Sequence, residues 1–311
     1  MAQPADRPGG LTNLQKRILS AAVLLPLAIA AIWFGTPWFD MLVALFAAGM
    51  AWEWTRIVAH ERAPGATSPV PVPTAPGWRS ILFFPSVTAV GVALAAQSYA
   101  TTETVLPGVS IPLNAAIASA VTKIGILVAG GTMLTGIAAA VANRQKALWF
   151  MAGVPYVALP AAALVLVRVD PDYGRAALFW IIALVVAADT GGYIAGRSIG
   201  GPKLAPRISP NKTWAGLGGA VAGSALVGLL TAFVLNHTDV WMLTLISAGL
   251  GLVEQAGDLV ESAFKRHFGV KDTSQIIPGH GGVLDRVDGL LAVAVAVLAL
   301  SVWAGGSVLA W

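Results

Sequence analysis

The sequence predicts an all-α fold: a polytopic integral membrane bundle of about nine transmembrane helices, with the N-terminus inside and the C-terminus outside (N-in/C-out). Three observations support it, namely a very apolar composition, a series of long apolar runs, and an uneven distribution of Lys and Arg. The chain is 57% hydrophobic and only 11% charged, whereas soluble domains carry about 25% charged residues. So few charges cannot cover the surface of a water-soluble protein of this size.

Nine apolar runs are long enough to cross a membrane, because a hydrocarbon core of roughly 30 Å requires about 20 apolar residues in a helix. They lie at about residues 18–35, 38–58, 80–99, 113–142, 147–167, 176–195, 215–235, 241–260 and 289–305. The fourth is overlong and contains Lys123, and the eighth continues into polar residues. We expect one membrane domain over 1–311, with mainly apolar spans in 1–180 and the catalytic part in 185–305.

The positive charges favour one orientation. With nine spans and a cytoplasmic N-terminus, the inner segments hold 16 of the 19 Lys and Arg, and the outer loops hold only Arg168 and Arg175. Lys and Arg concentrate on the cytoplasmic side of membrane proteins. We therefore expect a multi-pass protein of the cell (inner or plasma) membrane with its active site facing the cytoplasm. The same bias explains the net charge of +4 without a nucleic acid partner.

Several chemistries are excluded by what the sequence lacks. There is no cysteine, which rules out disulfides, thiolate catalysis and Cys-ligated zinc. The phosphate-binding pattern G-x-x-x-x-G-K-[ST], the dinucleotide pattern G-x-G-x-x-G and the zinc pattern H-E-x-x-H are also absent. A nucleotide-dependent enzyme with this sequence therefore needs a different scaffold.

One polar helix face continues the eighth apolar run. At 100° per residue, Glu254, Asp258, Glu261, Ser262 and Lys265 fall within an arc of about 100°. Ionisable groups in or at the edge of a bilayer are costly and are functional candidates by default. An ion pair between Glu261 and Lys265, four residues apart, is the structural alternative, but it leaves Glu254 and Asp258 unexplained.

A second polar segment precedes the ninth run. Its glycines allow backbone conformations closed to other residues and a close approach of N–H groups to an anion. Asp285 and Asp288 lie one helical turn apart and, with Asp258, offer the oxygen ligands that Mg²⁺ requires. The compensating positive charge comes from Lys265, Arg266, Lys271 and Arg286. Carboxylates beside basic residues and a glycine-rich loop are typical of metal-assisted phosphoryl or nucleotidyl transfer.

The segment 189–213 is the third polar region. Asp189 either orients a basic group or binds a second cation. Lys212 and Thr213 precede the seventh run, and a helix N-terminus favours phosphate. The alternative for the basic residues here is snorkelling to the membrane interface. Gly219 and Gly223 form a GxxxG pattern, which predicts helix packing rather than ligand binding.

These segments resemble a known family. The residues from Ser262 to Asp288 match the signature of the phosphatidate cytidylyltransferase (CDP-diacylglycerol synthase) family, which runs S-x-x-K-R, four spacers, K-D, then P-x-H-G-G-x-x-D-R-x-D. The segments 189–193 and 209–213 are similar to upstream elements of that family. The resemblance covers about residues 185–305, and residues 1–140 match only as apolar spans.

The resemblance implies an activity and roles for individual residues. It implies that CTP and phosphatidic acid, a membrane lipid, give CDP-diacylglycerol and pyrophosphate with Mg²⁺, in an all-helical fold that is typically a homodimer. Catalytic roles fall to Asp258, Lys265, Asp285 and Asp288, with the three aspartates as metal ligands; alternatively, Asp288 orients Arg286. The expected substrate-binding residues are Asp189, Ser209, Lys212, Thr213, Ser262, Arg266, Lys271, His280, Gly281, Gly282 and Arg286.

Two other functions fit the composition. A CTP-dependent lipid kinase of the polyprenol or phytol type would transfer the γ-phosphoryl group instead, but the complete K-D to D-R-x-D motif argues against it. An ion-coupled transporter would use Asp189 and Asp258 to couple ions. Discontinuous apolar segments in matching halves of the chain are typical of such transporters, and the sequence has none.

Overall fold

The computed structural model describes residues 13–59, 113–142, 144–236, 239–277 and 281–311. These residues form eight α-helices, one β-hairpin and a short 3-10 helix. In chain order they are α1 (Asn13–Phe34), α2 (Trp38–Ala59), α4 (Leu113–Ala142), α5 (Ala147–Val169), α6 (Gly174–Ser198), β1 (Lys203–Ala205), β2 (Ser209–Thr213), α7 (Trp214–Val234), α8 (Val240–His267), α9 (Leu284–Ala304) and η2 (Val308–Ala310).

Seven of these helices, α2 and α4 to α9, are long and apolar enough to cross a membrane. The apolar part of α1, Ala22–Phe34, is shorter than a full span. Large apolar side chains such as Leu45, Val234 and Trp303 are 67%, 77% and 81% exposed, as expected for a surface that lipid covers. The chain is a polytopic helical membrane protein. The predicted span at 80–99 lies outside the described residues, and the other eight predicted runs coincide with helices.

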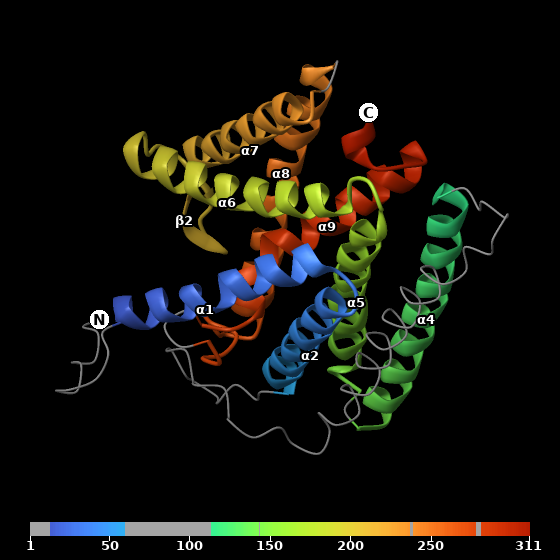
Figure 1. The fold of residues 1–311 in the computed structure, drawn as a ribbon. Helices are drawn as coiled ribbons and strands as arrows, with labels where there is room; N and C mark the ends of the chain where they lie inside the picture. Colours follow the sequence, from blue (N-terminus) through green and yellow to red (C-terminus); the bar gives the residue numbers. More distant parts are fainter. Residues whose placement is uncertain (1–12, 60–112, 143, 237–238, 278–280) are drawn as a thin grey trace, which may run out of the picture.

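The helices pack around α5 and α9 (Figure 1). The central helix α5 contacts α2, α4, α6 and α9, and α4 lies at the edge of the molecule against α5. The helices α6 and α7 lie side by side and pack most closely, and α7 in turn packs on α8. The core that joins these helices includes Val154, Ile181 and Leu184, all fully buried.

The close contact of α6 with α7 depends on glycine. A Cβ atom added to Gly219 would lie 2.3 Å from the carbonyl oxygen of Gly191, and one added to Gly223 would lie 2.5 Å from that of Ala187. Only glycine lets the two backbones approach so closely. The packing role predicted for the GxxxG pattern is confirmed.

A short hairpin departs from the all-helical expectation. The strands β1 and β2 pair antiparallel, with Lys203 opposite Thr213 and Ala205 opposite Ser209. Prolines at 202, 206 and 210 lack the N–H that a helix interior needs, so this segment cannot continue α6. The hairpin ends where Thr213 caps α7, its Oγ1 accepting a hydrogen bond from the N–H of Gly216 at 3.0 Å.

One end of the bundle collects the polar segments. Trp54 near the end of α2 stacks on Phe264 near the end of α8, with ring centroids 3.9 Å apart. The indole Nε1 of Trp54 donates to the carbonyl of Trp149 at the start of α5. The hairpin and the start of α9 lie at this same end, because Lys212 contacts Asp258 and Asp285 contacts Lys265. At the opposite end Arg168 donates to the carbonyl of Ile32.

Candidate active site

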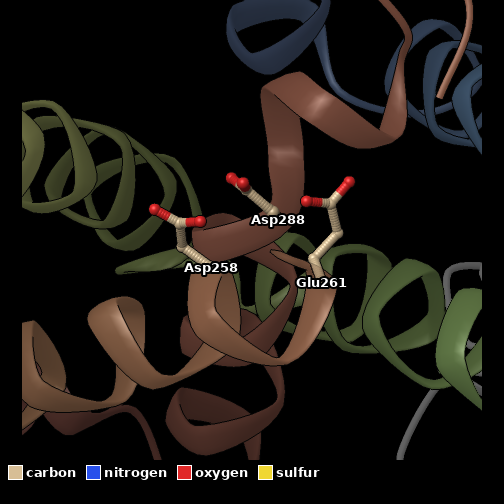
Figure 2. A group of neighbouring side chains, drawn as sticks. All are labelled: Asp258, Glu261 and Asp288. Atoms are coloured by element: carbon tan, nitrogen blue, oxygen red, sulfur yellow. The ribbon is translucent and has the colours of Figure 1, made fainter. Parts of the chain in front are cut away.

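Three carboxylates form a cluster between α8 and α9. Asp258 and Glu261 lie on one face of α8 because they are three residues apart, and Asp288 of α9 points between them (Figure 2). Each residue offers a carboxylate oxygen, and these oxygens all lie within 4.8 Å of one another. We call Asp258, Glu261 and Asp288 the carboxylate cluster.

Glu261 is the most buried member of the cluster, with 1% of its surface exposed. Its Oε2 lies 2.6 Å from Nζ of Lys265, one turn further along α8. In spite of this ion pair, neither oxygen of Glu261 makes a well-aligned hydrogen bond with any described residue. A buried charge is costly unless it is paired and hydrogen-bonded. The cluster therefore has an acceptor, Oε1 of Glu261, that the described protein groups leave without a partner.

Lys265 joins α8 to α9. Besides Glu261, its Nζ contacts Oδ1 of Asp285 at 2.8 Å, and its side chain is 11% exposed. The i, i+4 ion pair considered as the structural alternative does form. It is one half of a bridge between two helices, so Lys265 neutralises two buried carboxylates at once.

Asp285 lies beside the cluster and is engaged at both oxygens. While Oδ1 pairs with Lys265, Oδ2 accepts hydrogen bonds from the N–H groups of Thr273 and Gly282, each at 2.9 Å, and lies 3.1 Å from the Thr273 hydroxyl oxygen. The sequence grouped Asp285 with Asp258 and Asp288, whereas the structure groups those two with Glu261. The first turn of α9 directs Asp285 back to its own loop.

A second lysine reaches the cluster from the hairpin. Nζ of Lys212 lies 2.6 Å from Oδ2 of Asp258 and donates to Oε1 of Gln255 at 2.8 Å. Gln255 in turn donates through Nε2 to buried Glu254 at 2.8 Å, and Ser262 donates to Oδ1 of Asp258 at 3.1 Å. The hairpin, 43 residues before Gln255 in the chain, thus contributes a cation to the site.

The other expected substrate-binding residues surround this centre or serve the fold. Asp189 of α6 is exposed and interacts electrostatically with Asp258, Lys212 and Arg286. Ser209 begins β2 and Thr213 is the buried cap of α7. Lys271 and Arg286 are exposed.

Arg266 and the glycine loop take part in protein contacts. Arg266 donates to the carbonyl oxygens of Ile208 at 3.3 Å and Val270 at 2.9 Å, which ties the hairpin to the end of α8. Gly281 has a positive φ of 93°, a conformation that favours glycine. The N–H of Gly282 points to Asp285. His280 lies outside the described residues.

Two residues of the N-terminal helices belong to this region and were not singled out from the sequence. Glu53 of α2, which is fully buried, accepts hydrogen bonds from Thr273, Ser274, Val283 and Leu284. Tyr156 of α5 interacts electrostatically with all three carboxylates of the cluster. The sequence feature that could have indicated Glu53 is its position as an acidic residue inside an apolar run. No sequence feature indicated Tyr156.

Comparisons with known proteins identify the family. The sequence profile of the Cytidylyltransferase family matches residues 15–303. A protein of Brucella suis biovar 1 (strain 1330) named phosphatidate cytidylyltransferase is 34% identical over 284 residues, which cover 91% of this chain and 92% of that protein. A protein of the same name from Staphylococcus epidermidis (strain ATCC 35984) is 50% identical over 117 residues, 37% of this chain and 45% of that protein. The chain belongs to the cytidylyltransferase family.

Proposed function

We propose that this protein is a CTP:phosphatidate cytidylyltransferase, a membrane nucleotidyltransferase that makes CDP-diacylglycerol and pyrophosphate for phospholipid synthesis. The observation that carries the proposal is the carboxylate cluster flanked by Lys212 and Lys265, in a chain whose relatives are named phosphatidate cytidylyltransferase. The site lies where helix ends meet, so a polar nucleotide can arrive from water and a lipid from the bilayer.

The reaction forms one P–O bond and breaks another. An oxygen of the phosphatidate phosphate attacks the α-phosphorus of CTP, the bond to the bridging oxygen of the β-phosphate breaks, and pyrophosphate leaves with that oxygen. The attacking oxygen is already anionic, so no strong base is required. The difficulty is the approach of two polyanions, which fixed positive charge relieves. Lys212 and Lys265 are placed on two sides of the cluster to supply that charge.

The carboxylate cluster fits a Mg²⁺ ion. Its three side chains offer the hard oxygen ligands that Mg²⁺ prefers, and the buried oxygen Oε1 of Glu261 has no described hydrogen-bond partner. Asp258, Glu261 and Asp288 would hold the ion, which would neutralise charge on the phosphate oxygens when bound. Asp285, in this proposal, orients Lys265 instead of contacting the metal. Asp189 remains the candidate for a second cation.

The remaining substrate contacts are proposed for the exposed basic residues. Lys271 lies in the segment after α8 and Arg286 in the first turn of α9, and both are exposed. Their exposure suits the triphosphate of CTP, which arrives from the aqueous side. Ser209, Ser262, Arg266, His280, Gly281 and Gly282 are proposed to complete the substrate site, as the family resemblance implies.

We further propose that the site faces the cytoplasm in the cell membrane, with the N-terminus inside and the C-terminus outside. The outer face then carries Arg168 and Arg175, which contact the carbonyl of Ile32 and the ring of Trp33. A reporter that is active only in the cytoplasm can be fused after Trp311. If this fusion protein showed reporter activity, the proposed orientation would be wrong. The homodimer, and the division into apolar spans over 1–180 and a catalytic part over 185–305, also remain proposals.

Purified protein in lipid nanodiscs tests the activity directly. With labelled CTP and phosphatidic acid, we expect a labelled lipid product and one pyrophosphate released per lipid. A lipid kinase would release CDP and leave the label of the cytidine in water, and a transporter would form no product. The Asp258→Asn protein is the negative control, and Asp172→Asn, exposed between α5 and α6, is its matched active control.

A further inference from the structure

We propose that Glu53 of α2 is a positioning residue that anchors Thr273, Ser274 and the start of α9, and thereby fixes the charged groups of the site. This inference rests on the proposed function. Glu53 is fully buried, and its carboxylate accepts hydrogen bonds from four donors. These are the hydroxyl of Thr273 at 2.9 Å, the hydroxyl of Ser274, the N–H of Val283 at 2.8 Å and the N–H of Leu284 at 2.8 Å.

The chemistry of these contacts requires a carboxylate. Val283 caps α9 and Leu284 begins it, so their N–H groups are among those that the helix itself cannot satisfy. A negative charge at a helix N-terminus is also stabilising. One N–H points to Oε1 of Glu53 and the other to Oε2. A glutamine would present its NH₂ group to one of these two donors, so that one backbone N–H would lose its acceptor.

The contacts of Glu53 continue without a gap into the site. The hydroxyl of Thr273 lies within hydrogen-bond distance of both Glu53 and Asp285, at 2.9 and 3.1 Å. Asp285 holds Lys265, and Lys265 holds Glu261 of the carboxylate cluster. A displacement of the Glu53 carboxylate therefore reaches the cluster through four successive contacts and three intervening residues. Glu53 acts on the reacting groups through these residues.

The loop is packed against Glu53 too tightly for any side chain at 282. A Cβ atom added to Gly282 would lie 1.8 Å from the hydroxyl oxygen of Thr273 and 2.6 Å from Oε1 of Glu53. Such distances would force the side chains of Thr273 and Glu53 to move, which would disturb the hydrogen bond between them. The packing of Glu53 and Thr273 against Gly282 thus explains why this position of the H-G-G motif is a glycine. The motif packs directly on α2.

The test compares Glu53→Gln with Asp40→Asn. Asp40 is the matched control because it is also a buried acid of α2, 4% exposed, but lies in the first turn, at the other end of the helix from Glu53. In nanodiscs, hydrogen–deuterium exchange of the peptide containing Val283 and Leu284 reports on the anchor without any substrate. Steady-state kinetics at varied Mg²⁺ report on the site.

For Glu53→Gln we expect faster exchange confined to 273–284, and a fall in kcat of roughly tenfold to a hundredfold, because small misplacements of reacting groups have effects of this size. The Mg²⁺ concentration for half-maximal rate should rise. Asp40→Asn should leave the exchange and the Mg²⁺ dependence as in the wild type. Thr273→Val, which removes only the hydroxyl between Glu53 and Asp285, should lower kcat while the N–H groups of 283 and 284 stay protected.

Two results would overturn the inference: a Glu53→Gln protein with wild-type kcat and Mg²⁺ dependence, or faster exchange spread evenly over all helices, which would indicate general destabilisation. Failure of the proposed function looks different. A wild-type protein that forms no CDP-diacylglycerol refutes that function, whereas the exchange experiment still shows whether Glu53 anchors the loop.

Discussion

The two lysine–aspartate pairs of the site differ in their surroundings. The pair of Lys265 with Asp285 is enclosed by α8, α9 and the loop anchored on Glu53, and its side chains are 11% and 5% exposed. The pair of Lys212 with Asp258 lies where the hairpin meets α8, and its side chains are 17% and 24% exposed. The enclosed pair holds two helices together. The more open pair is partly accessible to solvent, so the two pairs differ in how tightly the protein encloses them.

The largest effect is expected at the enclosed pair. Lys265→Met keeps the length of the side chain but leaves Glu261 and Asp285 buried without their cation, and breaking a buried ion pair in this way costs about 3–5 kcal/mol. We expect loss of both activity and thermal stability, measured by activity and by thermal aggregation of the purified protein in detergent. Wild-type stability would mean that the enclosed pair does not hold α8 to α9.

At the open pair, Asp258→Asn should abolish most turnover while the protein stays folded. The amide keeps the shape and can still accept the hydrogen bond of Ser262, but it loses the charge proposed to bind Mg²⁺. We expect kcat to fall roughly a hundredfold or more, with the melting temperature close to wild type. Near-normal turnover at limiting Mg²⁺ would remove Asp258 from the metal site. Asp285→Asn should instead lower the melting temperature. The two aspartate variants therefore differ in whether they mainly affect turnover or thermal stability.

Lys212→Gln should have a moderate effect on catalysis and a small one on stability. A pair this close to the surface stabilises the fold by less than about 1 kcal/mol. We expect kcat/KM for CTP to fall about tenfold, because one of several cations facing the phosphates is lost. Lys203→Gln, exposed at the start of the same hairpin, is the matched control. Kinetic constants within about twofold of wild type would support snorkelling as the role of Lys212.

The smallest effect is expected at Ser262, which donates one hydrogen bond to Asp258. The Ser262→Ala substitution removes this hydrogen bond and should raise the activation free energy by about 1 kcal/mol. This corresponds to a fall of about fivefold in kcat. Single-turnover measurements at saturating Mg²⁺ would separate this loss from weaker metal binding. A loss as large as that of Asp258→Asn would show that the Ser262 hydroxyl contributes more than this one hydrogen bond.

Much of the fold could be predicted from the sequence because the bilayer imposes simple rules. Span length and the small-residue pattern of α7 depend on composition and period alone. The helix face of 254–265 was equally accessible, since 100° per residue fixes which side chains share a side. The hairpin was not, because prolines indicate where a helix stops but not how the chain then pairs.

The composition of the carboxylate cluster depended on tertiary contacts. Asp285 and Asp288 differ by about 60° around α9, and this is enough for one to face its own loop and the other to face α8. Glu261 appeared in the sequence as a partner of Lys265, since no local pattern reveals that both of its oxygens lack a hydrogen bond from the described residues. Glu53 could not be linked to the site from the sequence, because its partners lie 220 to 231 residues further along the chain.

The contacts of Glu53 also bear on how the protein is made. Its four partners come 220 to 231 residues later in the chain, which at 5–20 residues per second is roughly 10 to 45 seconds of synthesis. During that interval the carboxylate of α2 has entered the membrane region without the donors that satisfy it. The hydrogen bonds of Glu53 to Val283 and Leu284 can form only after the start of α9 has been synthesised.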